Sequence, residues 1–280
     1  MQTKITKKKD DILFHYTSIG TLLKILDIHD DKKICLRATH AKYFNDPFEY
    51  KLAVDMFKTS LVQYEKQNLI KDKKSQHFDK KSFASLGILA GYPYILSLSE
   101  NADDLTMWRT YGADGKGVAI GFDKKMLNDY SEDKENVNTR LIKCQYKKEA
   151  IIKGLIIYWD AIYNKINFQG KRISTESFRL IFDLSNFCFS FKRNEYQNEK
   201  EWRLCKNDWD NKNIRFQERD GLIIPYIEYT FPKEIIKKII IGPCLNKLLT
   251  RESILILLKS RKFQLTKESI TMSRVPYRSI

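Results

Sequence analysis

Two glutamates in the last third of the chain have the types and spacing of a reaction centre. Glu199 and Glu201 stand two positions apart in "QNEKEWRL" and are followed by Trp202 and Arg203. If this stretch is a strand, both carboxylates point to one face. Arg203 would hold Glu201 ionised, and the neighbouring indole would partly exclude water from it. An ionised carboxylate stabilises the positive charge that develops on a ribose when a nicotinamide–ribose bond breaks.

In this interpretation Glu201 is the catalytic carboxylate, and Glu199 helps to deprotonate an acceptor. The same alternation of charges is also typical of a solvent-exposed edge strand. The residue pattern by itself leaves both interpretations open.

Three further polar clusters lie at predicted strand ends or tight turns, where binding sites are commonly built. His15 in "HYTS" could donate a hydrogen bond to a ribose or an amide. Ser97 and Ser99 alternate on a predicted strand, so both hydroxyls would face one side and could hold a nucleotide. Asn45 and Asp46 belong to a predicted turn that leads into a helix. Each cluster also has a structural alternative. His15 would be a core-edge histidine, the two serines would belong to a half-exposed strand, and Asp46 would cap a helix.

A short predicted helix carries Trp108, Arg109 and Tyr111. Its aromatic rings could stack on a base or a nicotinamide, and its guanidinium could pair with a pyrophosphate. An aromatic core with a surface arginine is the alternative. The following stretch "YGADGKGVAIGFD" resembles a phosphate-binding loop, but it precedes a strand and so lacks the helix N-terminus that binds anions. We therefore expect its glycines to form a tight turn.

Composition limits the classes of protein. The net charge of +15 over 280 residues favours polyanionic partners such as nucleic acid or nucleotides, although a general bias towards lysine would give the same charge. The five cysteines are scattered, which predicts a reducing cytoplasm. The histidines and cysteines show no metal-binding spacing, so no metal cofactor is expected. No apolar run is long enough to span a bilayer, so no membrane association is expected.

The order of the elements predicts one α+β domain over residues 1–280, with a mixed, mostly antiparallel sheet and a helical insertion at about 148–195. The predicted strands are 12–16, 33–38, 92–100, 117–123, 140–147, 199–205, 221–229, 237–242 and 263–269. The predicted helices are 19–28, 48 into the 60s, 103–112, 148–167, 175–193 and 246–259.

A series of motifs resembles an uncharacterised bacterial family, one of the domains of unknown function. The motifs occur in order from about Ile12 to Arg278 as "HYTS", "FNDPFE", "SLSE", "MWRTYG", "GKGVAIGFD", "EKEWRL", "IIIGP" and "SRVPYRS". The most specific parts are Met-Trp-Arg with Tyr-Gly in the fourth motif and Glu-Trp-Arg in the sixth. This resemblance by itself supplies no activity.

The chain is also distantly similar to the ADP-ribosyltransferase superfamily, through a histidine in the first strand, a Ser-x-Ser and a late Glu-x-Glu. The resemblance implies an ADP-ribosyltransferase-like fold and NAD as a substrate. His15 would grip the adenosine-side ribose, Ser97 and Ser99 would brace the pocket, Glu201 would be catalytic, and Glu199 would face the acceptor. The other residues expected to contact NAD are Tyr16, Thr17, Trp108, Arg109, Tyr111 and Arg203, with Asn45 and Asp46 as further site residues.

These features predict an NAD-dependent ADP-ribosyltransferase or NAD glycohydrolase, acting as a bacterial toxin or phage-defence effector on a nucleic-acid, nucleotide or protein acceptor. One alternative is a nucleic-acid-binding regulatory domain without catalysis. Another is a metal-dependent nuclease, in which Asp114 and Lys116 act with Asp46 or Glu49. The chain departs from the transferase pattern by combining the histidine of one class with the Ser-x-Ser of another.

Overall fold

The computed structural model describes residues 11–26, 32–44, 49–68, 92–136, 138–165, 183–184, 187–206, 213–244 and 246–278. The chain forms two compact units, each of which combines helices with mostly antiparallel strands, so the α+β class is confirmed. Unit 1 contains Met1–Leu36, Leu98–Asp133 and Tyr229–Ile280, and unit 2 contains Arg37–Ser97 and Lys134–Glu228. Strands β2 (Lys33–His40), β3 (Tyr94–Ser99) and β8 (Leu222–Pro232) contribute residues to both units. The prediction of a single domain stays a prediction.

Unit 1 is built on strands that pair in the order β10, β9, β4, β1 and the end of β3. Strands β9 and β10 are parallel, whereas β4 is antiparallel to both β1 and β9. In chain order the further elements are β1 (Ile12–Thr17), α1 (Ile19–Leu26), α4 (Leu105–Thr110), β4 (Val118–Asp123), α5 (Lys124–Glu132), η4 (Lys233–Ile235), β9 (Ile236–Ile241), α8 (Lys247–Ser260), η5 (Lys267–Ser269) and β10 (Ile270–Met272).

The apolar run "GVAIGFD" forms the central strand of unit 1, as predicted. Every residue of β4 except Asp123 is buried, because the strand has a hydrogen-bonded neighbour on each side. Short polar side chains cap the first turns of helices α1 and α8. The Ser18 hydroxyl accepts a hydrogen bond from the Thr21 amide at the start of α1, and Asn246 caps α8 in the same way.

The glycine-rich stretch after α4 forms the expected tight turn. Gly115 has a φ of +78°, and Ala113 and Asp114 before it have φ values of 50° and 53°, which non-glycine residues rarely adopt. Gly117 ends the turn where the backbone meets the end of β1. A Cβ atom at this position would lie 2.1 Å from the carbonyl oxygen of Thr17, so only glycine fits without a shift of the backbone.

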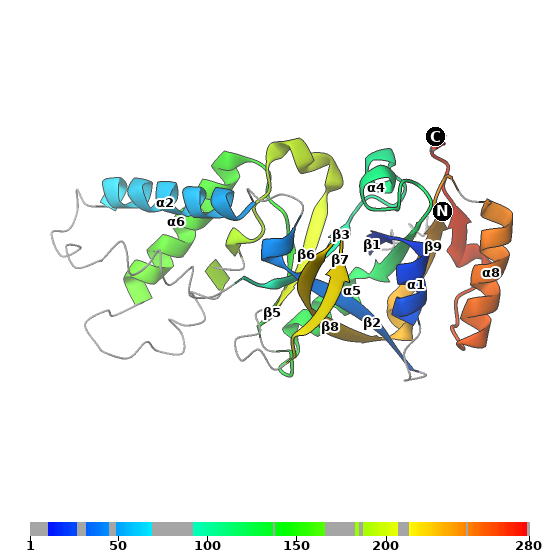
Figure 1. Ribbon diagram of the computed structural model, residues 1–280. Helices are drawn as coiled ribbons and strands as arrows, with labels where there is room; N and C mark the ends of the chain where they lie inside the picture. The colour runs from blue at the N-terminus through cyan, green and yellow to red at the C-terminus, as the bar shows by residue number, and fades with distance from the viewer. Residues whose placement is uncertain are drawn as a thin grey trace, which may run out of the picture. The chain divides into compact units, whose positions relative to one another are not determined.

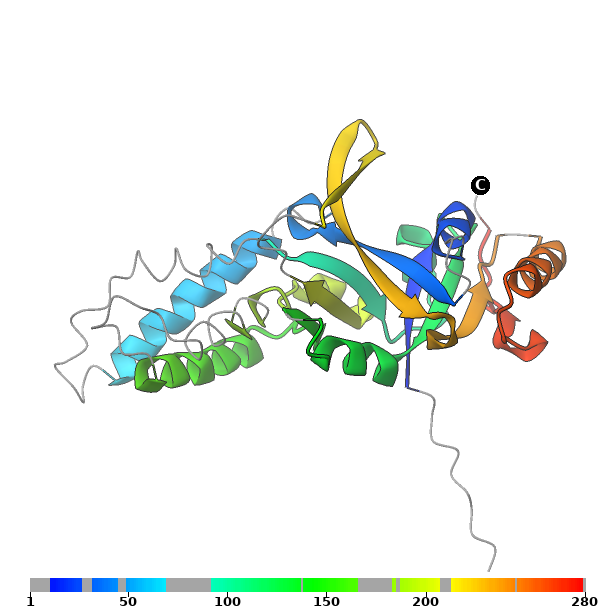
Figure 2. The same cartoon turned by 90° about the horizontal axis from the view of Figure 1, so that it is seen from below.

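Unit 2 contains the pairs β5–β6, β6–β3, β3–β2, β2–β8 and β8–β7. Figure 2 shows β7 and β8 running together as a hairpin, which the register of the two strands confirms. In chain order the further elements are η1 (Ala41–Tyr43), α2 (Glu49–Asn68), β5 (Thr139–Lys143), α6 (Lys148–Lys165), η3 (Asn194–Glu199), β6 (Glu201–Lys206) and β7 (Arg215–Arg219).

The two long helices α2 and α6 lie side by side in both Figure 1 and Figure 2, and their shared core confirms both predicted helices. Trp159 is fully buried between them, and its indole nitrogen donates to the Ser60 hydroxyl at 2.9 Å. Near the same core, the Tyr64 hydroxyl donates to Asp160 at 3.3 Å. A buried indole that finds a partner avoids the cost of an unsatisfied donor.

Several element boundaries were predicted wrongly. The last strand is Ile270–Met272, because the residues before it form a 3-10 turn rather than an extended strand over 263–269. The helix predicted over 175–193 falls partly outside the described residues, and near its end Phe191 pairs with Gln145 in a parallel bridge. Among the α-helices and strands that the structure describes, two were missed. Helix α5 begins on a cap from Asp123, and β7 has no buried face that would mark it as a strand.

Replacing Gly117 by Ala should destabilise the protein by about 3 kcal/mol, because the added methyl group collides with backbone rather than with a flexible side chain. Urea unfolding followed by circular dichroism measures the change. Gly20→Ala is the matched control in unit 1, because a Cβ atom there meets nothing closer than the Ser18 hydroxyl at 3.8 Å. Equal stabilities of the two variants would contradict the expected collision.

Candidate functional site

The glutamates of "QNEKEWRL" belong to a buried ion network in unit 2. The Lys192 ammonium contacts Glu199 Oε2 at 2.5 Å and Glu201 Oε2 at 2.8 Å. Arg203 donates from Nε to Glu201 Oε1 at 3.0 Å and from Nη2 to Glu201 Oε2 at 3.1 Å. Both oxygens of Glu201 are therefore bonded to cations. We call these four residues the ion network.

The interior position of the ion network determines its electrostatics. Glu201 is 4% exposed and Arg203 is 1% exposed. Burial alone would raise the pKa of Glu201, but the charges of Arg203 and Lys192 outweigh it and lower that pKa to about 2. The carboxylate is therefore ionised throughout the physiological range. The prediction that Arg203 holds Glu201 ionised is confirmed, whereas Lys192 was not foreseen as a second cation.

The two carboxylates meet for a different reason from the expected strand alternation. Glu199 ends the 3-10 helix η3, and Lys200 adopts a left-handed conformation with φ 43°, so strand β6 begins only at Glu201. The backbone amide of Glu201 donates to the Tyr146 hydroxyl at 2.8 Å, and its carbonyl accepts from the Cys144 amide at 2.9 Å. These bonds fix the position of Glu201 against the residues after β5.

Aromatic rings other than Trp202 line the ion network. The Arg203 guanidinium carbon lies 5.6 Å above the Phe44 ring, and the Lys192 ammonium lies 4.9 Å from the Tyr196 ring. Trp202 is only half-buried, and the ammonium of Lys143 on β5 lies 5.7 Å from its ring. Successive side chains of β6 point to opposite faces, so the expectation that Trp202 dries Glu201 is wrong.

A second polar cluster, in unit 1, is centred on Asp103. Its Oδ1 atom accepts hydrogen bonds from Trp108 Nε1 at 2.7 Å and from the Ser273 hydroxyl at 2.6 Å. Its Oδ2 atom accepts from the backbone amide of Arg274 at 2.7 Å. Asp103 thus connects helix α4 to the segment after β10.

Tyr16 and Trp108 also lie together in unit 1. Their rings are edge to face with centroids 4.8 Å apart, and Trp108 is fully buried. The Tyr16 hydroxyl donates to the Asn101 carbonyl at 2.9 Å and accepts from the Asp104 amide. Burial raises the pKa of Tyr16 well above its ordinary value, so the hydroxyl stays protonated. Both rings serve the core of unit 1 in this structure.

His15 lies apart from these aromatic residues. It occupies the middle of β1 rather than its end, and Tyr16 next to it points to the Trp108 side. Since neighbouring side chains of a strand point to opposite faces, His15 faces the other side of the sheet. Ser99 is the direct antiparallel partner of Phe14, whose ring packs with Tyr16 and Trp108. The structure therefore does not bring the imidazole together with the Ser99 hydroxyl.

The remaining predicted residues have structural surroundings of their own. Ser99 is 1% exposed, and its hydroxyl accepts from the Asn101 amide at 2.9 Å. Thr17 is buried at the end of β1. Arg109 is exposed, with its guanidinium carbon 5.9 Å from the Tyr277 ring, and Tyr111 caps the end of α4.

Ser97 is half-buried on β3 in unit 2. Asn45 and Asp46 lie outside the described residues. The NAD contacts expected of these residues, and of His15, Tyr16, Thr17, Ser99, Trp108, Arg109, Tyr111 and Arg203, stay predictions.

Sequence reasoning missed the two residues that organise these clusters. Asp103 had a local signal, because it stands with Asp104 directly before a short helix with a tryptophan, where an acidic side chain commonly serves as a cap or an acceptor. Lys192 had no such signal. It lies seven positions before Glu199 in a segment predicted as a helix, and only the fold directs its ammonium to the two carboxylates.

Comparison with known proteins supports part of the sequence interpretation. Residues 107–204 match the sequence model of a family described as "Protein of unknown function (DUF2971)". This segment is less than half of the chain and runs from the start of the "MWRTYG" motif to the end of "EKEWRL". Searches among curated proteins and among solved structures return no match. The resemblance to an uncharacterised family is supported over this segment, and the resemblance to ADP-ribosyltransferases stays a prediction.

Replacing Asp103 by Asn should destabilise unit 1 by about 2 kcal/mol, because an amide group replaces one carboxylate oxygen and leaves a buried donor facing another donor. Limited proteolysis should then cleave the segment after β10 sooner. Thermal unfolding and the rate of cleavage are the measurements. Asp129→Asn on α5, in the same unit, is the control. Unchanged values for Asp103→Asn would show that the hydrogen bonds to its carboxylate contribute nothing to stability.

Replacing Glu201 by Gln should lower the free energy of unfolding by about 3 kcal/mol at neutral pH, because it leaves Lys192 and Arg203 buried with only one carboxylate. The pKa of Glu201 is lowered from 4.5 to about 2. Its ion pairs therefore stabilise the fold fully above about pH 5, and this contribution is lost as the pH falls towards 2.

Urea unfolding between about pH 7 and pH 3 gives the free energy of unfolding of the wild type and of Glu201→Gln at each pH. The difference between the two pH dependences measures the contribution of the Glu201 ion pairs. The stability of the wild type should fall more steeply in acid than that of Glu201→Gln. Glu195→Gln, an exposed glutamate of η3, is the control and should follow the wild type. Parallel losses in the wild type and Glu201→Gln would contradict the ionised state of Glu201.

Proposed function

We propose that the protein cleaves the nicotinamide–ribose bond of NAD, as an ADP-ribosyltransferase or an NAD glycohydrolase, with Glu201 as the catalytic carboxylate. The pairing of the buried Glu201 with two cations is the observation that supports this most. Arg203 and Lys192 keep the carboxylate ionised at a position that is 4% exposed. An anion in such dry surroundings acts on a developing positive charge with less screening than it would in water.

Lys192 has a specific part in this proposal. Because both oxygens of Glu201 are bonded to cations, Glu201 acts on a ribose only after one cation moves away. Lys192 is bonded to Glu199 as well, so it can release Glu201 and still keep an anionic partner. Arg203 also donates from Nη1 to the Phe189 carbonyl at 2.6 Å, which keeps the guanidinium in place.

This proposal assigns separate roles to the two carboxylates. Glu201 lies between two cations and stabilises the oxocarbenium-like ribose once Lys192 has moved. Glu199 holds Lys192 during that step and stands on the acceptor side, as the resemblance implies. Arg203 is a positioning residue, because its two bonds to Glu201 keep the carboxylate ionised and oriented. No step needs a metal ion or a nucleophilic cysteine.

The charge of the chain supports an anionic acceptor. A net charge of +15 attracts nucleic acids and nucleotides at long range, so they are favoured over a neutral acceptor. A protein acceptor is compatible with the same chemistry. The proposed setting is a bacterial toxin or phage-defence effector, and the scattered cysteines favour the cytoplasm as its compartment. Among the described residues, no helix is both long enough and apolar enough to cross a membrane.

A nucleic-acid-binding domain without catalysis is the second candidate. It is favoured by the closed charge balance of the ion network, in which two carboxylates meet two cations and each charge has an opposite partner. Such a network can have a structural role in the fold without taking part in catalysis. The nuclease alternative gains no support from Asp114, because its carboxylate accepts from the Tyr277 hydroxyl at 2.6 Å, and no metal-binding group of three His, Cys, Asp or Glu side chains occurs among the described residues.

Purified protein should release nicotinamide from NAD, and Glu201→Gln should do so about 100-fold more slowly, because the substitution keeps the shape of the side chain and removes its charge. Chromatography of the reaction products measures the rate. NAD should also raise the melting temperature of the wild type, since a ligand that binds only the folded state stabilises it.

Glu195→Gln on the exposed side of η3 is the matched control and should cleave NAD at the wild-type rate. The unfolding curve of Glu201→Gln must show a folded protein at the assay temperature. A folded Glu201→Gln variant with wild-type activity would refute the proposed mechanism. Absence of both nicotinamide release and thermal stabilisation in the wild type would favour the second candidate.

A further inference from the structure

A cluster of aromatic side chains lies in unit 2 where β2 ends and β3 begins. The His40 ring centroid lies 5.7 Å from that of Tyr43, 5.4 Å from Tyr92 and 5.3 Å from Tyr94. His40 and Tyr94 are direct partners in the antiparallel β2–β3 pair, so the backbone holds them side by side. Tyr94 is buried, whereas the other three rings are half-buried. We call these four residues the aromatic cluster.

The contacts of His40 favour the neutral form of its ring. Its Nδ1 atom accepts a hydrogen bond from the backbone amide of Lys42 at 3.3 Å, as the cap of η1. Burial, and then the charge of Lys42, lower the pKa of His40 below its ordinary value. The imidazole and the tyrosine rings beside it present flat π faces, against which another planar ring can stack.

The aromatic cluster adjoins the ion network within unit 2. The Tyr92 ring centroid lies 6.3 Å from that of Phe189. The carbonyl of Phe189 accepts from Arg203 Nη1 at 2.6 Å, and the Phe44 ring, next in sequence to Tyr43, lies 5.6 Å from the same guanidinium. Contacts through Phe189 and Phe44 therefore connect the partly exposed rings to the residues that bond Glu201.

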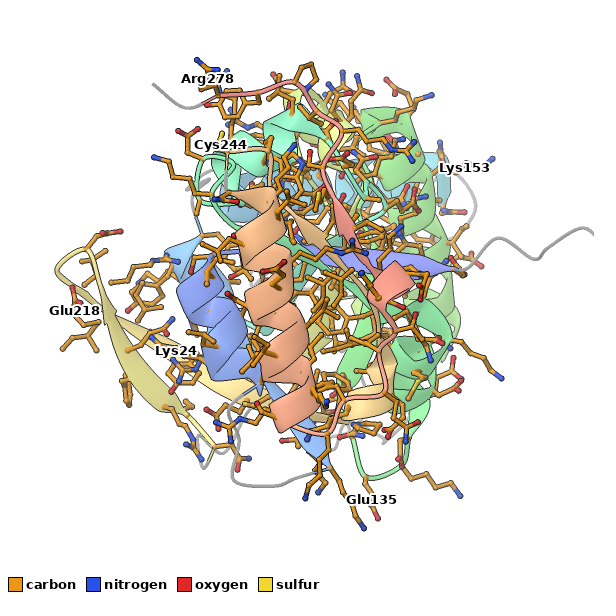
Figure 3. The ribbon with its side chains drawn as sticks, turned by 90° about the vertical axis from the view of Figure 1, so that its right-hand side faces the viewer. Lys24, Glu135, Lys153, Glu218, Cys244 and Arg278 are labelled. Carbon is orange, nitrogen blue, oxygen red and sulfur yellow. The ribbon has the colours of Figure 1, made fainter. Side chains whose placement is uncertain are left out.

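Positive charges border the aromatic cluster. Lys42 is exposed and stands between His40 and Tyr43 in the sequence. The exposed Arg219, at the end of β7, donates from Nη2 to the Tyr43 carbonyl at 3.4 Å. Figure 3 labels the neighbouring Glu218 on the β7–β8 hairpin. A lysine and an arginine beside half-buried rings complement a ligand that is planar at one end and anionic at the other.

We propose that the aromatic cluster binds a nucleotide, with its base stacked against Tyr43 and Tyr92 and its phosphate near Lys42 and Arg219. Aromatic stacking next to basic side chains is the arrangement that binds single-stranded nucleic acids without reading their sequence. A free nucleotide and a nucleotide within a single strand share this chemistry. The inference goes beyond the proposed NAD cleavage, because binding at this site needs no reaction at Glu201.

Fluorescence anisotropy with two labelled single strands of about 12 nucleotides tests the proposal, one of thymidines and one abasic. Both strands carry the same phosphates, so a difference in affinity measures stacking of bases. The wild type should bind the thymidine strand about tenfold more tightly than the abasic strand. In Tyr43→Leu and Tyr92→Leu, the affinity for the thymidine strand should fall to about that for the abasic strand.

Tyr158→Leu is the matched control. Tyr158 is a half-buried tyrosine on α6 in the same unit, and its ring packs on Phe187 at 5.3 Å, outside the aromatic cluster. It should bind both strands as the wild type does. Lys42→Ala should lower the affinity for both strands by the same factor, because it removes a positive charge and leaves the aromatic rings in place. Displacement of the thymidine strand by adenosine monophosphate would assign the site to free nucleotides as well, and its failure would restrict the site to strands.

Equal affinity of the wild type for the two strands would overturn the proposal. So would a preference for thymidine that persists in Tyr92→Leu, shown by circular dichroism to be folded. The assay of nicotinamide release is independent of this result. Nicotinamide release without a preference for the thymidine strand would refute the nucleotide site alone. A preference for the thymidine strand without nicotinamide release would refute the NAD cleavage alone.

Discussion

A carboxylate that leaves water stays ionised only where cations or hydrogen-bond donors stabilise it, and this constraint organises the centre of unit 2. Glu201 is buried, so Arg203 and Lys192 are both held against it, and Lys192 brings Glu199 to the same place. The backbone follows this requirement. Lys200 adopts a left-handed conformation so that Glu199 and Glu201 reach one ammonium from different elements. The same four charges provide the ionised carboxylate on which the proposed chemistry depends.

The cluster around Asp103 meets the corresponding constraint with hydrogen bonds instead of ion pairs. One carboxylate satisfies an indole, a hydroxyl and a backbone amide, and thereby connects α4 to the segment after β10. Tyr16, Trp108 and Ser273 lie together in unit 1, where Tyr16 packs on Trp108 and Asp103 accepts from both Trp108 and Ser273. These hydrogen bonds and ring contacts stabilise unit 1, and they account for the identity of these residues without a ligand.

In unit 2 the rings and the charges are neighbours. The carbonyl of Phe189 holds Arg203, and its ring is near that of Tyr92 in the aromatic cluster. A nucleotide stacked on this cluster would therefore lie near the residues that control Glu201. Buried charges beside partly exposed aromatic rings are a combination that a purely structural core does not require. This neighbourhood connects the two proposals physically, although each stands on separate contacts.

The sequence by itself determined the α+β class, the central strand "GVAIGFD", the long helices α2 and α6, the glycine turn and the pairing of Arg203 with Glu201. Each of these follows from local periodicity, from turn chemistry or from residues two positions apart. Local patterns did not predict the boundaries of β6 and β10, or the strand β7, which lacks a buried face. Pairing between residues distant in the sequence decides these features.

Only the tertiary structure decided which distant side chains meet. It directed Lys192 to two carboxylates, Asp103 to the segment after β10, and His40 to Tyr92, because these contacts arise from strand pairing and chain reversal that no local spacing records. It also placed His15 and Ser99 on opposite faces, since the register of β1 with β3 fixes the side to which each residue points.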